Sequence, residues 1–371
     1  IPGGGTYDLQ GSLRTNVAAP GPLTLLSARW EFQDANWFPD FPATARQIMQ
    51  FYGDAGGGTV DGVIAVNATY VQDFLTLLGP IEMPEYGRTI DASNLISEAQ
   101  KIVEIEYDRT ENRPKAFIGD LAPKLVERVM DGSSQDFFAV IDRVDAGLRG
   151  RDVQVYFTDE ELERQVRELG WGGEVRQTSS DYLMLVDTNL GGGKTDGVIS
   201  ETADVVVAIG EDGSIVNTVT VTRTHNGASG EEFSGVNNMD YVRLYVPKGA
   251  TLLSAGGFTI PDRSLFEQPS DEWQIDDDLL YPMDSHSEDP ASQTDIYEEF
   301  GKTVFGNWVQ TKPGESSAFT FVYRLPFSLT TKLDDSIAAV AKRAIGMPTT
   351  EPYSFTLQKQ SGVQNRTTRV S

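Results

Sequence analysis

Three basic residues, Arg109, Arg113 and Lys115, stand close together in a chain that is otherwise strongly acidic. Planar guanidinium groups form paired hydrogen bonds with phosphate or carboxylate oxygens, so this group could clamp an anionic ligand. Several acids lie between positions 104 and 111. They offer the alternative that opposite charges pair locally around the end of a helix, and this is the interpretation that we favour.

The aromatic motif Asp34-Ala-Asn-Trp-Phe-Pro-Asp-Phe-Pro42 contains three residues with the chemistry of a sugar site, Asn36, Trp37 and Asp40. In a glycan contact, an exposed indole ring would stack on the sugar beside the polar side chains. In the alternative, the tryptophan is buried in the core of its domain, and Asn36 and Asp40 bond the loop backbone. The second interpretation is the stronger one.

Acidic residues gather at Asp276, Asp277 and Asp278, within an acidic segment that runs from 262 to 300. Calcium takes about six to eight oxygen ligands from side chains of this kind. The segment lacks the Asp-x-Asp-x-Asp-Gly spacing of a calcium loop, which favours a solvated acidic loop. The sequence therefore predicts no required cofactor, with calcium or magnesium as the ion if this segment binds one.

The segment Gly191-Gly-Gly-Lys-Thr195 has the ending of a phosphate-binding loop. Such a loop also needs a glycine where this chain has Thr188, and a helix directly after the lysine and threonine. The residues that follow, Asp-Gly-Val, do not favour a helix. We therefore expect a flexible crossover between two domains here and no nucleotide site.

Composition narrows the chemistry further. The chain of 371 residues has no cysteine and only two histidines, which excludes thiolate chemistry and leaves histidine-based metal sites poorly supplied. It has 30 basic and 55 acidic residues, for a formal net charge of −25. This charge repels phosphate backbones, so we expect no nucleic-acid partner. No stretch reaches the roughly 20 apolar residues of a membrane span.

The elements that would position these residues change in type along the chain. Residues 1–29 form a weakly patterned arm rich in glycine and proline. From 30 to 195, helical and strand patterns alternate, which predicts an α/β domain with a mixed sheet and flanking helices. Helices are expected at 42–52, 68–78, 92–107, 115–130, 135–148 and 159–169, and strands at 60–66, 81–83 and 153–157.

After Gly170 this alternation gives way to consecutive short strands. They predict an antiparallel β-sandwich over 202–371, with 262–300 as an acidic loop and a helical insert at 332–345. Glu211-Asp-Gly-Ser214 is expected to form a hairpin turn, because Asp-Gly accepts a positive φ at little cost. Strands are expected at 182–186, 203–209, 215–224, 242–246, 303–310, 318–323 and 353–358.

Several motifs, in their order along the chain, resemble a family of bacterial cell-envelope proteins. They are Trp30, Asp34-Ala-Asn-Trp-Phe-Pro-Asp-Phe-Pro42, Val60-Asp-Gly-Val-Ile-Ala-Val66, Leu78-Gly-Pro80, Asp181-Tyr182, Val186-Asp-Thr-Asn189, Lys194-Thr-Asp196 and Tyr245-Val-Pro247. From about residue 30 to about 360 the chain is similar to the uncharacterised family called domain of unknown function four-thousand-and-twelve. The resemblance implies an extracytoplasmic location in the cell envelope or at the cell surface, an N-terminal membrane anchor absent from this chain, and no assigned activity.

Part of the pattern also resembles the LytR–CpsA–Psr glycopolymer transferases. The segment from Val60 to Glu82 is similar to the strand and helix that lead to a Gly-Gly-Val-Glu turn in those enzymes. An Asp-x-x-Arg-x-x-Arg-Gln motif follows there, and its arginines hold a lipid pyrophosphate. Asp108-Arg-Thr-Glu-Asn-Arg113 is the nearest counterpart, with a different spacing and no glutamine. The resemblance therefore implies a shared fold more than a shared reaction.

These observations favour a non-catalytic, extracytoplasmic module of the cell envelope that acts in binding or assembly. Its expected partners are a cell-wall or surface glycopolymer or other copies of the same chain, and it would reach the membrane only through an anchor. The alternative is a LytR–CpsA–Psr-like transferase that moves glycopolymer from a lipid pyrophosphate carrier to the cell wall, with Arg109 and Arg113 on the pyrophosphate. The sequence by itself leaves open whether the chain is an enzyme.

Overall fold

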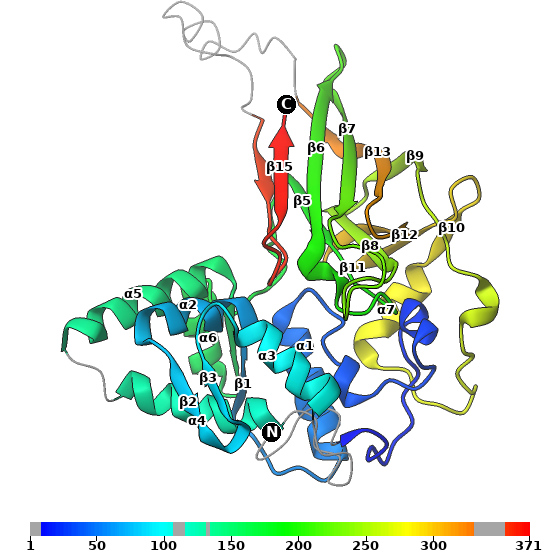
Figure 1. The fold of residues 1–371 in the computed structure, drawn as a ribbon. Helices are drawn as coiled ribbons and strands as arrows, with labels where there is room; N and C mark the ends of the chain where they lie inside the picture. Colours follow the sequence, from blue (N-terminus) through cyan, green and yellow to red (C-terminus); the bar gives the residue numbers. More distant parts are fainter. Residues whose placement is uncertain (1–8, 107–115, 131–133, 330–352) are drawn as a thin grey trace, which may run out of the picture. The chain divides into compact units, whose positions relative to one another are not determined.

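A computed structural model describes residues 9–106, 116–130, 134–329 and 353–371 and divides the chain into two compact units (Figure 1). The first unit contains the described residues up to Ala18, Arg29–Val175 and Asp271–Gln274. The second contains Ala19–Ala28, Arg176–Ser270 and the described part of Ile275–Ser371. The first unit combines helices and strands, and strands dominate the second. The predicted order of an α/β domain and a sheet-rich domain is confirmed at this level.

Most helices of the first unit lie within two residues of the ranges that hydrophobic periodicity predicts. They are α1 (Phe41–Asp54), α2 (Ala68–Leu78), α4 (Ala116–Met130), α5 (Ser134–Gly150) and α6 (Glu160–Leu169). The helix expected at 92–107 is instead α3 (Leu95–Lys101) followed by a π-helical turn, η5 (Ile102–Glu106). None of the helices described is both long and apolar enough to cross a membrane.

The strands of the first unit form two small sheets. β1 (Gly62–Val66) pairs antiparallel with β4 (Val153–Phe157), and β2 (Ile81–Met83) pairs antiparallel with β3 (Arg88–Ile90). The sequence predicts one mixed sheet, whereas the strands described make two separate two-stranded antiparallel sheets. A pair of strands is stable only when other elements pack on it, and the helices supply that cover.

Two larger sheets make up the second unit. Their strand orders are β10-β11-β12-β8-β5-β14 and β15-β6-β7-β13-β9. Both sheets contribute side chains to one hydrophobic core, among them Leu244 and Phe305 from one sheet and Val219 and Phe321 from the other. The strands are β5 (Asp181–Val186), β6 (Ile199–Ile209), β7 (Ser214–His225), β8 (Asn238–Pro247), β9 (Thr251–Gly256), β10 (Ser287–Asp289), β11 (Thr294–Glu299), β12 (Lys302–Thr311), β13 (Ser316–Ser328), β14 (Phe355–Leu357) and β15 (Arg366–Val370).

Strand β7 shows how the sequence specifies one buried face. Every second residue from Ile215 to His225 is buried, and the residues between them are half-buried or exposed. This strict alternation places one face of the strand on the core. The turn before the strand is the predicted Asp-Gly turn, in which Gly213 has φ 79° and donates its N–H to the carbonyl of Gly210 at 2.9 Å.

Both sheets of the second unit are mixed, because each has a parallel strand at one edge. β14 pairs parallel with β5, and β15 pairs parallel with β6 (Figure 1). The sequence predicts a purely antiparallel arrangement, and the structure differs at these two edges. Pairs so far apart along the chain cannot be seen in local hydrophobic patterns.

Several predicted boundaries also differ from the structure. The two units change over at Val175, not at 195–202, because β5 pairs with β8 in the sheet-rich unit. The segment 262–300, expected as a loop, contains α7 (Asp277–Ser285), β10 and β11. The arm expected at 1–29 has buried Leu13 and Val17 among its described residues. The helical insert expected at 332–345 lies outside the residues described.

Candidate functional site: a buried ion network

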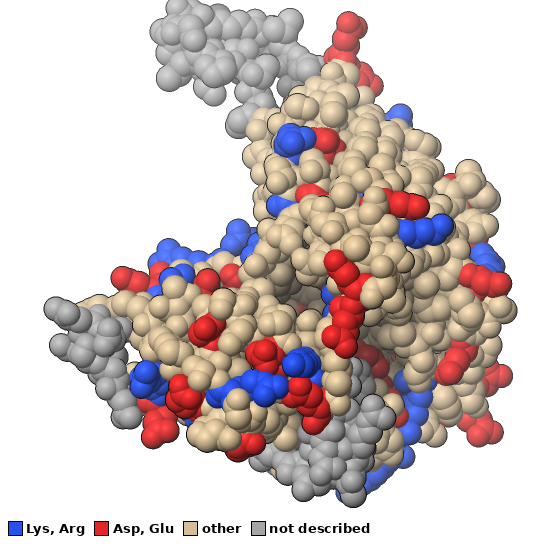
Figure 2. Space-filling view, in the orientation of Figure 1, with Lys and Arg blue, Asp and Glu red and all other residues tan. Residues whose placement is uncertain are grey.

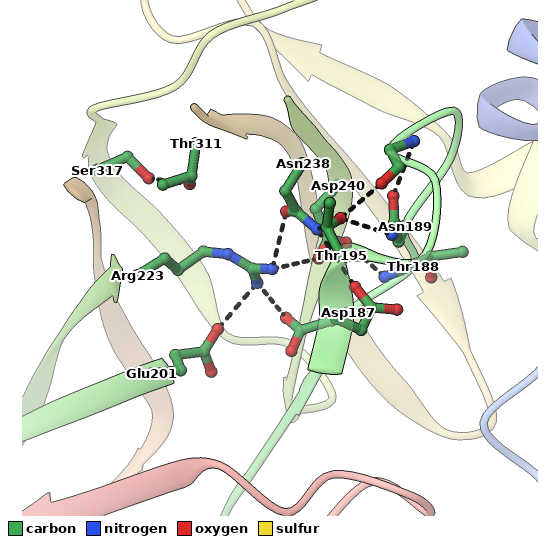
Figure 3. Close-up of polar contacts among 12 residues, drawn as sticks. Asp187, Thr188, Asn189, Thr195, Glu201, Arg223, Asn238, Asp240, Thr311 and Ser317 are labelled. Atoms are coloured by element: carbon green, nitrogen blue, oxygen red, sulfur yellow. Dashed lines mark hydrogen bonds and ion pairs between the residues drawn. The ribbon is translucent and has the colours of Figure 1, made fainter. Parts of the chain in front are cut away.

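The second unit contains a network of buried ionisable side chains centred on Arg223 of β7 (Figure 3). The Arg223 side chain is only 2% exposed. Its Nη1 lies 2.9 Å from Glu201 on β6 and 3.0 Å from Asp187. Its Nη2 lies 2.6 Å from Asp240 on β8 and donates to Asn238 at 3.2 Å. One guanidinium group therefore joins strands from both sheets.

The loop after β5 is built into the same network. The Thr195 hydroxyl accepts hydrogen bonds from Asn189 at 3.2 Å and Asn238 at 2.9 Å, and it donates to the carbonyl of Gly192 at 2.6 Å. A Cβ on Gly192 would lie 2.2 Å from the side-chain oxygen of Asn189, so the close approach requires glycine. The loop expected to be a flexible crossover between domains is therefore packed, and it lies inside the sheet-rich unit.

A second arginine reaches the network from β15. Arg366 donates from Nη1 to the carbonyl of Leu185 at 2.7 Å and forms ion pairs with Glu201 and Asp187. Both carboxylates are thus shared between Arg223 and Arg366. The two arginines and the shared acids connect β15 to the interior of the unit.

The carboxyl groups of the network differ in pKa because burial raises the pKa of each group and the nearby cations oppose this rise to different extents. Burial raises the pKa of Asp240 to about 8; the Arg223 cation opposes this rise, and the charges of Asp187 and Asp196 add to it. Burial also raises the pKa of Asp196. Burial would raise the pKa of Asp187 as well, but Arg366 and Arg223 hold it below its ordinary value. Asp240 and Asp196 therefore retain their protons to a higher pH than they would in water, whereas Asp187 releases its proton at a lower pH.

The other end of β5 has its own polar contacts. Asp181 is fully buried and accepts hydrogen bonds from Asn217 at 2.7 Å and from the hydroxyl of Tyr353. Burial raises the pKa of Asp181. Tyr182, next in the chain, donates its hydroxyl to Gln358 at 2.8 Å. The motif Asp181-Tyr182 on β5 thus holds the C-terminal segment in place.

The basic cluster Arg109, Arg113 and Lys115 lies outside the residues described. On the face of the first unit that Figure 2 shows, basic side chains are interspersed with acids. Arg88 lies 2.6 Å from both Glu98 and Glu106.

The aromatic motif has a structural position in the first unit. Trp37 is 5% exposed, which removes most of its ring face from solvent, whereas Asn36 is exposed. Asp40 caps α1 by accepting from the N–H of Ala43 at 3.3 Å, and it also accepts from the N–H of Val175 at 3.0 Å. Burial raises the pKa of Asp40. The three residues do not share an exposed face suited to a sugar.

The acidic triplet begins helix α7. Asp276 is the N-cap and accepts from the N–H of Asp278 at 2.9 Å, and Asp277 lies in the first turn. Acids at a helix N-terminus are stabilised by the helix dipole. In the part of the chain that the structure describes, no group of three or more His, Asp or Glu side chains is arranged to hold a metal ion.

Arg223 is not among the residues that the motifs single out, although the sequence carries a signal for it. In Val219-Thr-Val-Thr-Arg-Thr-His225 the arginine occupies a position that strand alternation assigns to the core. A charged residue at such a position needs buried partners of opposite charge. The acids of the motifs Val186-Asp-Thr-Asn189 and Lys194-Thr-Asp196 lie in the network with it.

Comparison with known proteins supports the family resemblance. Residues 15–103 match the profile of a family described as Protein of unknown function (DUF4012). No curated protein and no solved structure matches the chain.

Replacing Arg223 by methionine should lower the free energy of unfolding by about 3–5 kcal/mol, because buried carboxylates lose their shared cation. Urea unfolding followed by tryptophan fluorescence measures this change. Arg324→Met, at an exposed position on the neighbouring strand β13, is the matched control and should change the stability by about 0.5 kcal/mol or less. Equal stabilities of the two variants would show that the network does not hold the unit together.

Asp240 should also give the protein a characteristic dependence on pH. Because its pKa is raised from 3.8 to about 8, the folded state binds the proton more tightly, and this contribution to stability is lost as the pH rises between these values. Asp240→Asn should flatten the slope of unfolding free energy against pH over this range. Asp204→Asn, on the exposed face of β6, should leave the slope unchanged. An unchanged slope in Asp240→Asn would contradict the assignment.

Proposed function

We propose that this chain, which matches the family of unknown function over residues 15–103, is a non-catalytic module of the cell envelope that acts outside the cytoplasm in binding and assembly. The polar residues of the family motifs support this proposal. Asp181, Asp187 and Thr195 are bonded to other parts of the same unit. Strand edges and exposed apolar side chains are available for binding in the described part of the chain.

One edge of β1 is unpaired among the strands described. On one side β1 pairs with β4, and no other strand among those described pairs with it. The N–H of Asn67 bonds the carbonyl of Asp152 at 2.9 Å, which fixes the phase of the antiparallel ladder. Since bonded and non-bonded pairs alternate, the backbone groups of Ile64 and Val66 point away from β4.

The side chains of the same two residues are exposed. Ile64 is 64% exposed and Val66 49% exposed. Their register partners, Val155 and Val153, lie on the same face of the sheet and pack in a hydrophobic cluster with Leu148. The apolar face of the sheet therefore extends from Val153 and Val155, which pack in the cluster, to the exposed Ile64 and Val66 at the unpaired edge of β1. An apolar strand edge of this kind accepts an added strand, and this observation carries the proposal.

Two further features belong to the proposal. The shared core supports an arrangement of the two sheets of the second unit as a β-sandwich. The net charge of −25 and the lack of cysteine suit a protein outside the cytoplasm that stays soluble through its charge. The partner that we propose for the β1 edge is another copy of the chain.

The test is Ile64→Pro, which removes the outward N–H without removing a bond to β4. Wild-type protein should show a mass in solution that rises with concentration, and this rise should be smaller in the variant, as measured by light scattering. Leu162→Ala, which trims an exposed apolar side chain on α6, is the control and should assemble like wild type. Wild-type protein that stays monomeric, or an Ile64→Pro variant whose mass rises with concentration as steeply as that of wild type, would refute the proposal.

A further inference from the structure

Strand β15 lies beside β6 and bonds to it through the backbone (Figure 1). The N–H of Glu201 donates to the carbonyl of Asn365 at 2.8 Å, and the N–H of Ser371 donates to the carbonyl of Val205 at 2.9 Å. Main-chain bonds of this kind form with almost any extended segment. Any preference for one sequence must therefore come from the side chains.

One side chain of the segment is deeply held. The Arg366 side chain is 10% exposed, and its fork meets Glu201 through Nε, Asp187 through Nη2 and the carbonyl of Leu185 through Nη1. Glu201 is itself 4% exposed. A planar guanidinium group can serve these three acceptors at once, which an ammonium group cannot do with the same geometry.

The buried carboxylates beside β6 favour a positively charged side chain. Without Arg366, Arg223 would be the guanidinium group that the structure places at ion-pair distance from Asp187, Glu201 and Asp240. Buried carboxylates without a cation are strongly destabilising. The site beside β6 is therefore chemically a pocket for an arginine side chain.

The rest of the segment contributes little selectivity. Arg369 lies 3.2 Å from Asp204, but the two side chains are 67% and 48% exposed. Exposed ion pairs of this kind stabilise by less than about 1 kcal/mol. Thr367 is exposed, and Val370 is 48% exposed. The edge of β6 is thus selective for a single arginine within an extended segment.

We propose that the β6 edge is an acceptor site for an extended peptide with one arginine, and that its partner in assembly is Arg366–Val370 of a second copy. The same segment occupies the site within its own chain, which shows that its backbone and charge fit. The segment would make the same contacts with its own chain or with a second chain, so the protein concentration sets the balance between these two forms. The inference rests on the proposed function, assembly between copies, and adds a second edge to it.

Engineered disulfides can test this exchange, because the chain has no cysteine of its own. Thr202 and Thr367 are register partners on the outer face of the pair. Mixing a Thr202→Cys chain with a Thr367→Cys chain under mild oxidation should give a covalent dimer of the two. The double variant Thr202→Cys/Thr367→Cys should close the bond within one chain, which checks that the segment is placed as described.

The arginine is tested by two matched changes in the Thr367→Cys chain. Arg366→Ala should reduce the yield of mixed dimer by about ten- to a hundredfold, as expected for the loss of charge-assisted hydrogen bonds. Arg369→Ala should leave the yield close to that of the parent. Equal effects of the two changes would overturn the arginine pocket, and so would a double variant that forms no internal bond.

A mixed dimer that never forms, while the double variant closes normally, would show that the segment stays in its own chain. The same mixture in an Ile64→Pro background separates this inference from the proposed function. Mixed dimers that persist there support exchange at β6 independently of the β1 edge. Mixed dimers that disappear there show that pairing at β1 is required and overturn an independent β6 site.

Discussion

The burial of Arg223 is the constraint on which the second unit depends. A guanidinium group removed from water must keep its carboxylates, and here they come from β6, from β8 and from the residue directly after β5. The position of each strand is therefore tied to the same charge. Arg366 pairs with Glu201 and Asp187, whose negative charges Arg223 compensates only in part. The position of β15 therefore depends on the same network.

The motifs on which the family resemblance rests have structural roles in the described residues. Asp187 and Thr195 have residue types that could do chemistry, yet both are bonded within the network. Trp37 and Asp40, in the most specific motif, have buried and capping roles. In the described residues the motifs maintain the fold, and we propose that recognition takes place at strand edges, where backbone groups are available to a partner.

The sequence predicted what depends on local pattern and missed what depends on distant pairing. Helical periodicity placed α2 at its observed ends, and Asp-Gly located the turn before β7. The ion pair between Arg366 and Glu201 joins residues 165 positions apart, and nothing in a local pattern specifies it. For the same reason β15 went unrecognised, since its residues Arg-Thr-Thr-Arg-Val read as a polar segment.

Hydrogen–deuterium exchange at two protein concentrations tests whether the chain assembles by strand addition at β1. The amide of Ile64 points to the open side of β1, whereas that of Ala65 bonds β4. Strand addition at β1 predicts that exchange at Ile64 and Val66 slows as the concentration rises, while Ala65 is protected throughout. Exchange rates at Ile64 and Val66 that do not change with concentration would contradict it.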